Sequence, residues 1–262
     1  MQDAQARAVL RDALRRAPRG RTPHIVVFTG AGVSAESGIP TFRDALTGLW
    51  ERFDAQQLAT PEAFRRDPPL VWGWYEWRRM RAMQASPNAA HAAIAALEAG
   101  PARITVVTQN VDDLHERAGS REPVHLHGSL FAPRCFDCHE PATPGRSMPE
   151  EPEGGRRLAP PACARCGGPV RPGVVWFGEP LPESALAAAF DAAAACDVLF
   201  SVGTSSLVHP AAQVPVVAKE AGAFVVQVNP NATPLDPIAD LNVRGPAAIA
   251  LPPLLAACAG RE

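Results

Sequence analysis

The sequence predicts an α/β protein in which a parallel β-sheet carries helices on both faces and a smaller second lobe is inserted into the chain. Apolar runs rich in β-branched residues alternate with helical stretches, which is typical of a parallel sheet with crossover helices. Gly30 and Gly32 directly follow the first run, as expected where a strand ends at a phosphate group. Two segments, residues 42–100 and 131–179, break the alternation and predict the second lobe.

The apolar runs place the strands of the sheet. Four clear runs span residues 25–29, 104–108, 198–202 and 224–228, and a weaker one spans 124–126. Helical stretches span residues 89–98, 183–195 and 211–221. In such a sheet a ligand lies across the carboxyl ends of the strands, and here that edge would face the second lobe.

These elements predict two domains. A large, Rossmann-like nucleotide-binding domain would comprise residues 1–41, 101–130 and 180–262. A small domain would combine a helical insertion, residues 42–100, with a cysteine-containing module, residues 131–179.

The composition argues against several classes of protein. A formal net charge of -2 over 262 residues gives no electrostatic reason to expect a specific nucleic acid or an anionic membrane as a partner. Residues 1–20 carry arginines and acids without an apolar core, so they do not read as a secretory signal. No run is long and apolar enough to span a bilayer, and we expect a cytoplasmic protein.

Four of the six cysteines form two close pairs, Cys135 with Cys138 and Cys163 with Cys166. Four thiolates at this spacing suit tetrahedral Zn²⁺ with no open position, so we expect a structural zinc site. A nucleic-acid-binding zinc ribbon is the alternative, which the weakly basic intervening sequence disfavours. Cys196 and Cys258 lie in alanine-rich stretches and are expected to be small buried side chains.

The segment after the first strand departs from the usual dinucleotide fingerprint. Ala35 replaces its third glycine, which the fingerprint tolerates, but no second strand ending in an acid follows at the usual distance. Pro40 and the triplet Phe42-Arg43-Asp44 follow instead. We therefore expect the cofactor to be held in a different way.

Together with this segment, further sequence blocks resemble the sirtuins, the NAD-dependent protein lysine deacylases. In the order of that family, the blocks span residues 108–112, 125–128, 174–179, 203–205 and 228–230. The resemblance runs from about residue 25 to about residue 250. It implies NAD as co-substrate and one structural Zn²⁺ as cofactors, and acylated-lysine proteins as partners, with no specific nucleic acid and no membrane.

The resemblance also implies roles for individual residues. His127 would be the general base, a task that suits imidazole because its reference pKa lies near neutral pH, and Asn110 would join it as a catalytic residue. His125 and His115 would be structural. The residues expected to bind NAD are Gly30, Ala31, Gly32, Ser34, Thr41, Phe42, Arg43, Gln109, Asn110, Asp112, Gly203, Thr204, Ser205, Asn229 and Ala247.

In the implied reaction, the acyl oxygen of an acylated lysine attacks C1′ of the nicotinamide ribose, and nicotinamide leaves. His127 then removes a proton from a ribose hydroxyl, and the products are lysine and O-acyl-ADP-ribose. Val175, Trp176 and Phe177 would line the tunnel that holds the lysine. The protein would supply orientation and exclude water, whereas NAD supplies the electrophile.

Tyr75 and Arg78 bear on which acyl group is removed. They are three residues apart, so on a helix they share one face, and a guanidinium beside a phenol recognises a carboxylate. The sirtuin branch that removes succinyl, malonyl and glutaryl groups carries this pair, together with a small residue where Ala59 stands. The alternative is an ordinary helix whose arginines reach water, a role that Arg79 would fill equally well.

The leading hypothesis is thus an NAD-dependent deacylase that prefers acidic acyl groups and removes acetyl groups more weakly. Plain deacetylation is the closest alternative. An NAD-consuming or ADP-ribosyl-transferring module, or an NAD sensor, is a further alternative. His127 and the Trp176–Phe177 wall argue against it, because nucleotide binding alone requires neither of them. Gly173 departs from the side-chain-bearing residue of many sirtuins, a change that could loosen the loop on the substrate side.

Overall fold

The computed structural model describes residues 2–15, 21–39, 54–143, 150–152 and 155–259. A six-stranded sheet with the order β3-β2-β1-β6-β7-β8 forms the larger lobe, and every pair in it is parallel. Its strands are β1 (His24–Thr29), β2 (Arg103–Thr108), β3 (Val124–His125), β6 (Val198–Val202), β7 (Phe224–Val228) and β8 (Leu241–Val243). The order reverses between β1 and β6, and a crevice for a ligand opens at such a point.

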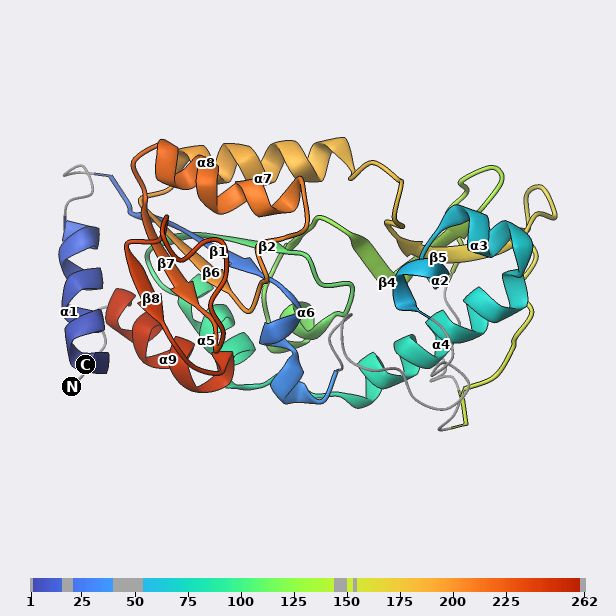
Figure 1. Ribbon diagram of the computed structural model, residues 1–262, viewed down its shortest axis with the longest axis horizontal. Helices are drawn as coiled ribbons and strands as arrows, with labels where there is room; N and C mark the ends of the chain where they lie inside the picture. The colour runs from blue at the N-terminus through green and yellow to red at the C-terminus, as the bar shows by residue number, and fades with distance from the viewer. Residues whose placement is uncertain (1, 16–20, 40–53, 144–149, 153–154, 260–262) are drawn as a thin grey trace.

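Helices cover both faces of this sheet, as Figure 1 shows. One face packs against α1 (Gln2–Arg15), α5 (Ala89–Glu98) and α9 (Ala247–Cys258). The other face packs against α7 (Glu183–Ala195) and α8 (Val214–Glu220). Strand β1 is buried along its whole length, because Ile25 and Val27 enter the first core while Val26 and Phe28 enter the second. The predicted parallel sheet is confirmed.

The smaller lobe combines two short helices and one long helix with a two-stranded antiparallel sheet. Its helices are α2 (Ala55–Leu58), α3 (Pro61–Arg66) and α4 (Pro68–Gln84), and its strands are β4 (Gly128–Cys135) and β5 (Val170–Val174). Thr60 and Asp67 start α3 and α4 by accepting hydrogen bonds from the backbone N–H groups of Ala63 and Leu70. A core separate from those of the sheet fills this lobe and includes Phe64, Trp74 and Trp176.

The structure differs from the sequence expectation at several elements. Residues 89–98 were assigned to the small domain, but α5 packs against the large sheet through Ala90, Ile94 and Leu97. We therefore propose that the small lobe ends before α5. Residues 211–221 contain a short 3₁₀ helix, Ala211–Gln213, followed by α8, and the weak third strand ends at His125.

Strand β8 was not predicted, because it is only three residues long and carries Asn242 at its centre. Gly173 was considered as a residue that could loosen the loop on the substrate side, but it has a different role in the structure. A Cβ there would lie 1.8 Å from the backbone oxygen of Ala132, so the glycine permits the tight approach of β4 and β5. Within the described part of the chain, no helix is long and apolar enough to cross a membrane.

Candidate active site

A cleft of about 1210 Å³ lies along the carboxyl ends of β1, β2, β6 and β7 and continues between the two lobes. Backbone and side chains of both lobes line it. Of the residues predicted to bind cofactor or substrate, it brings together Gly30, Ala31, Gly32, Ser34, Ala59, Tyr75, Arg78, Gln109, Asn110, Asp112, His127, Val175, Trp176, Phe177, Gly203, Thr204, Ser205, Asn229 and Ala247. The predicted residues Thr41, Phe42 and Arg43 lie outside the described residues.

The floor of the cleft is formed where the loops after β1 and β6 touch. The N–H of Gly32 donates to the oxygen of Gly203 at 2.8 Å, and a Cβ on Gly32 would lie 2.7 Å from the Cα of Gly203. Gly203 itself has φ of 60°, a conformation that favours glycine. These glycines are therefore required by the packing of two loops against each other, besides any approach to a phosphate.

The chain after Gly30 forms two short 3₁₀ helices, Ala31–Val33 and Ala35–Ser37. Ser34 lies between them and is buried. Its hydroxyl donates to Asp112 Oδ2 at 3.1 Å and accepts from Asn110 Nδ2 at 3.0 Å. This chain of hydrogen bonds connects the segment after β1 to the segment after β2, and it orients the Asn110 amide in the cleft.

Burial raises the pKa of Asp112, and hydrogen bonds from the Leu114 N–H and from Ser34 act in the opposite direction. Gln109, on the same segment, donates from Nε2 to Thr204 Oγ1 at 2.9 Å. Asn229 Nδ2 donates to the Thr204 oxygen at 2.8 Å. Polar groups that follow β2, β6 and β7 are thus joined into one surface at the edge of the sheet.

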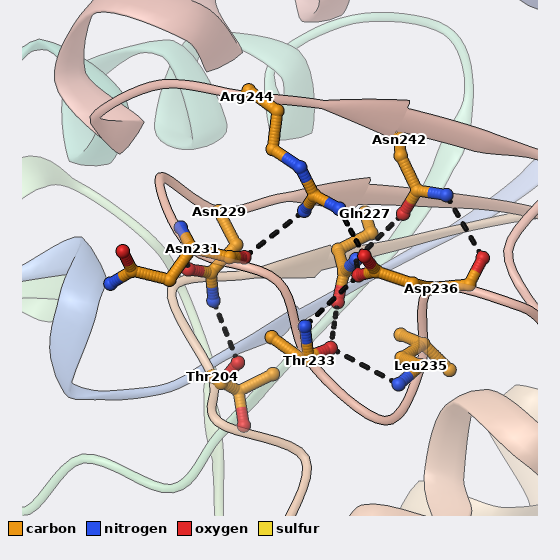
Figure 2. A network of polar contacts seen from close by, with 9 residues as sticks. All are labelled: Thr204, Gln227, Asn229, Asn231, Thr233, Leu235, Asp236, Asn242 and Arg244. Atoms are coloured by element: carbon orange, nitrogen blue, oxygen red, sulfur yellow. Dashed lines mark hydrogen bonds and ion pairs between the residues drawn. The ribbon is translucent and has the colours of Figure 1, made fainter.

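The loop after β7 is held by a network that the sequence analysis did not identify. Figure 2 shows its side chains converging on Asp236. Asp236 accepts from the Thr233 N–H, from Gln227 Nε2 and from Arg244, while Arg244 also donates to the Asn231 oxygen at 3.0 Å. The network fixes the part of the loop, Asn229 to Pro234, that lines the cleft. Its sequence signal is the Thr233-x-x-Asp236 spacing, which is typical of a side-chain-stabilised turn.

His127 follows β3 and faces the cleft. Its Nδ1 lies 2.9 Å from the backbone oxygen of Gln109, which can only accept, so Nδ1 carries the proton and Nε2 holds a lone pair. Burial lowers the pKa of His127, and the bond to Gln109 opposes this effect only in part. The neutral imidazole is therefore the favoured form near neutral pH.

The other two histidines named in the sequence analysis make structural contacts. His125 bonds to the Asn110 oxygen and to Glu116 Oε1, and these partners raise its pKa against the opposing effect of burial. His115 is buried beside Thr29 Oγ1 at 3.0 Å, and burial lowers its pKa to about 3.

Tyr75 and Arg78 lie on one face of α4 and line the cleft together, as their spacing predicted. The Arg78 guanidinium lies 5.8 Å from the centre of the Tyr75 ring and 5.1 Å from that of Trp74. Burial lowers the pKa of Arg78, whereas the neighbouring Tyr75 and Asp112 raise it. A cation held in a buried aromatic surrounding is a strong recognition group for an anion.

Arg79 points elsewhere, which separates it from Arg78. Its Nε and Nη2 donate to the two carboxylate oxygens of Glu76 at 3.0 and 2.8 Å. Arg79 and Glu76 line a second cavity, and Arg79 is absent from the residues described around the main cleft. The ordinary-helix alternative assumed that the two arginines are interchangeable. The structure shows that they are not.

The wall of the cleft is closed by the segment after β5. The Phe177 N–H donates to the Ala59 oxygen at 2.9 Å, and the Val175 N–H donates to the His127 oxygen at 2.8 Å. These bonds connect the helical insertion, the segment with His127 and the cysteine module. Phe177 remains 46% exposed at the mouth of the cleft.

The four paired cysteines come together at the end of β4. Their sulfur atoms all lie within 4.8 Å of one another, with 3.4 Å between Cys135 and Cys166 and 3.7 Å between Cys138 and Cys163. Four sulfurs about 2.3 Å from a tetrahedral Zn²⁺ would be about 3.8 Å apart, so the set fits a structural zinc ion. Arg165, in the second Cys pair, is bound to Glu140 at 2.8 Å, which offsets its charge.

Comparisons with known proteins agree with this geometry. A model of the Sir2 family matches residues 30–210. An NAD-dependent protein deacylase of Methylococcus capsulatus is 64% identical over 234 residues, which cover 89% of this chain and 92% of that protein.

Solved structures show the same likeness. The crystal structure of a Sir2 homolog–NAD complex has a TM-score of 0.84 at 44% identity, and the match covers 95% of this chain and 91% of that chain. A structure of Sir2 with a p53 peptide and NAD⁺ has a TM-score of 0.75 at 31% identity, covering 90% of this chain and 92% of the other.

We expect metal analysis of purified protein to find one zinc per chain and Cys138→Ser to lose it. Because the metal joins two loops of the small lobe, the variant should unfold about 5–10 °C earlier, as followed by circular dichroism. Cys258→Ser is the matched control and should keep the zinc. A wild-type protein without stoichiometric zinc would refute the assignment.

Proposed function

The chain belongs to the Sir2 family and is an NAD-dependent protein deacylase, and we propose that it prefers lysines carrying acidic acyl groups such as succinyl, malonyl and glutaryl. The observation that carries this preference is the placement of Tyr75 and Arg78 on the wall of the same cleft as His127. When bound, NAD supplies the electrophilic C1′ of the nicotinamide ribose. The remaining steps depend on groups of this chain.

We assign the role of general base to His127. Its Nε2 is the nitrogen left with a lone pair, because Nδ1 is bound to the Gln109 oxygen. Burial keeps the ring neutral, so the base is ready to accept a proton from a ribose hydroxyl without first losing one. The bond from Val175 N–H to the His127 oxygen fixes the backbone that carries the ring.

Asn110 and Asp112 are proposed to position the nicotinamide side of the cofactor. Ser34 connects them, because its hydroxyl donates to Asp112 and accepts from Asn110. Gln109 would join them at the nicotinamide ribose, whereas Gly203, Thr204, Ser205 and Asn229 would hold the adenosine half of the dinucleotide. Ala247, also proposed to bind the cofactor, lines the same cleft. Gly30, Ala31 and Gly32 allow the backbone after β1 to approach the pyrophosphate.

The acyl group is proposed to lie between Ala59 and the wall formed by Val175 and Trp176. A terminal carboxylate of that group would reach the guanidinium of Arg78 and the hydroxyl of Tyr75. A small side chain at Ala59 leaves room for the longer acyl chain. An acetyl group would enter the same space but carries no carboxylate for these two donors to bind.

The substrate is proposed to be an acylated lysine side chain of a protein. One of the structures similar to this chain is a complex of Sir2 with a p53 peptide. In this chain, Phe177, Leu207 and Val208 are exposed apolar residues lining the cleft, and they could pack against a peptide segment around the lysine.

We expect His127→Ala to abolish deacylation while NAD binding and zinc content stay close to wild type. The base acts after the cofactor is bound, so its loss removes a chemical step and not an attachment point. Turnover of an acylated peptide by mass spectrometry, with NAD binding by calorimetry, measures both. Near-wild-type turnover would show that His127 is not the base.

The pH dependence of kcat/KM should reflect the lowered pKa of His127. Catalysis requires the neutral imidazole, which is lost only as the pH falls through the pKa of the folded enzyme. The acid limb of kcat/KM should therefore lie below pH 6.5, with a plateau above it. A limb centred above pH 6.5 would contradict the assigned effect of burial.

We expect the enzyme to process succinyl-lysine peptide with a higher kcat/KM than the matched acetyl-lysine peptide. Hydrogen bonds to a charged group contribute about 1.5–3 kcal/mol, and only the succinyl carboxylate can form them with Arg78 and Tyr75, which predicts a roughly ten- to several-hundred-fold preference. Arg78→Met should remove most of this preference by lowering succinyl turnover far more than acetyl turnover.

Arg66→Met is the matched control, because Arg66 is an exposed arginine of α3 that does not line the cleft. It should leave the ratio of the two kcat/KM values as in wild type. Equal efficiency of the unmutated enzyme on both peptides would show that Tyr75 and Arg78 are only a helix face.

A further inference from the structure

Trp176 makes a hydrogen bond that an apolar wall does not require. Its indole Nε1–H donates to the Tyr75 hydroxyl oxygen at 3.0 Å. Both side chains are almost fully buried, with 1% of Trp176 and 3% of Tyr75 exposed. Trp176 lies on the segment after β5 and Tyr75 on α4, so the bond crosses between two insertions that are far apart in the sequence.

The direction of this hydrogen bond is fixed by chemistry. An indole N–H can only donate, so the Tyr75 oxygen must accept, and the hydroxyl proton of Tyr75 has to point elsewhere. Burial raises the pKa of Tyr75 to about 12, so that proton stays on the oxygen near neutral pH. Tyr75 lines the main cleft as well as the second cavity, so the hydroxyl proton that the bond from Trp176 does not use can be donated to a ligand in the main cleft.

The indole itself makes a second contact, with a buried arginine. The Arg171 guanidinium lies 3.4 Å from the centre of the Trp176 ring, and Arg171 is only 2% exposed. Arg171 Nη2 donates to Glu179 Oε2 at 2.9 Å and Nη1 donates to Oε1, which gives a two-pronged ion pair. Glu179 Oε2 also accepts from the backbone N–H of Trp176 at 2.9 Å.

These contacts form a continuous row from Glu179 through Arg171, Trp176 and Tyr75 to Arg78. At its cleft end stand the two groups proposed to receive an acyl carboxylate. A displaced indole would free the Tyr75 hydroxyl to rotate, and its proton would no longer be directed. A hydrogen bond to a charged acceptor depends strongly on this alignment.

We propose that Trp176 is a positioning residue for acyl specificity: its indole N–H orients the Tyr75 hydroxyl so that the phenolic proton is presented to the carboxylate of the acyl group, and the Arg171–Glu179 pair holds the indole in place. The proposal rests on the acidic-acyl preference proposed above. It assigns to Trp176 a role that acts through Tyr75, in addition to forming the wall of the cleft.

The test compares Trp176→Phe, Tyr75→Phe and the double variant on matched succinyl- and acetyl-lysine peptides. Trp176→Phe keeps an aromatic ring but removes the N–H donor together with part of the buried ring volume. It should lower the succinyl-to-acetyl ratio of kcat/KM roughly tenfold, mainly through the KM for the succinyl peptide. Tyr75→Phe should lower the ratio by at least as much.

The double variant separates positioning from packing. If Trp176 acts through the Tyr75 hydroxyl, the double variant should have the same succinyl-to-acetyl ratio of kcat/KM as Tyr75→Phe alone. A purely structural role would lower the activity on both peptides alike, with the ratio kept in Trp176→Phe. An equal loss of activity on both peptides in Trp176→Phe would overturn the proposal. So would a double variant in which the fold-decreases of the ratio seen in the two single variants multiply, because the two side chains would then act independently.

Glu179→Gln provides a second route, because Trp176 also packs against Phe64 at 5.3 Å and its replacement could impair folding. This variant keeps the indole and weakens the pair that holds it. It should lower the ratio by a few-fold in the wild-type background and not at all in Tyr75→Phe. The proposal is overturned if Glu179→Gln keeps the wild-type ratio of succinyl to acetyl kcat/KM while Trp176→Phe either keeps that ratio too or fails to fold.

The wild-type ratio distinguishes this proposal from the one on which it rests. No succinyl preference in the unmutated enzyme overturns both. A clear preference that Arg78→Met removes, but that Trp176→Phe and Glu179→Gln leave intact, overturns the role of Trp176 alone.

Discussion

The contact between the loops after β1 and β6 is the constraint on which the rest of the structure depends. The strand order reverses between these strands, so their loops diverge to opposite faces of the sheet and a crevice opens above them. Gly32 and Gly203 meet at the bottom of that crevice through a backbone hydrogen bond of 2.8 Å, with no room for a Cβ on Gly32. Ser34, Asn110, Thr204 and their neighbours take their positions from this floor.

Burial is the second organising influence, because it disfavours the charged form of four ionisable groups that line the cleft. It lowers the pKa of His127 and Arg78 and raises the pKa of Asp112 and Tyr75. In each case burial makes the charged form less favourable than it would be in water. A neutral imidazole suits a general base, and a protonated phenol suits a donor. A poorly solvated guanidinium gains more from an anionic ligand than an exposed one would.

The small lobe supplies the other wall, and it does so by joining two insertions. The cysteine cluster ties the loops that flank β4 and β5, while Phe64 and Trp176 pack at 5.3 Å in the aromatic core beneath α4. Backbone hydrogen bonds from Phe177 to Ala59 and from Val175 to His127 then fasten this lobe to the cleft. The residues proposed for acyl recognition and for catalysis are thereby held in one frame, although they come from separate segments.

The sequence by itself determined the parallel sheet, the spacing of the four thiols and the pairing of Tyr75 with Arg78 on one helix face. The sheet and the shared helix face follow from local periodicity, which is fixed by the geometry of a strand or a helix, whereas the thiol spacing is a metal-ligand motif read directly from the sequence. Only the tertiary structure decided that α5 packs on the sheet, that Arg79 is bound to Glu76 and that Trp176 donates to Tyr75. Periodicity states which residues share a face, but the partner of that face is set by how distant segments pack. That is why the sequence could name the members of the site and could not reveal the hydrogen bonds that orient them.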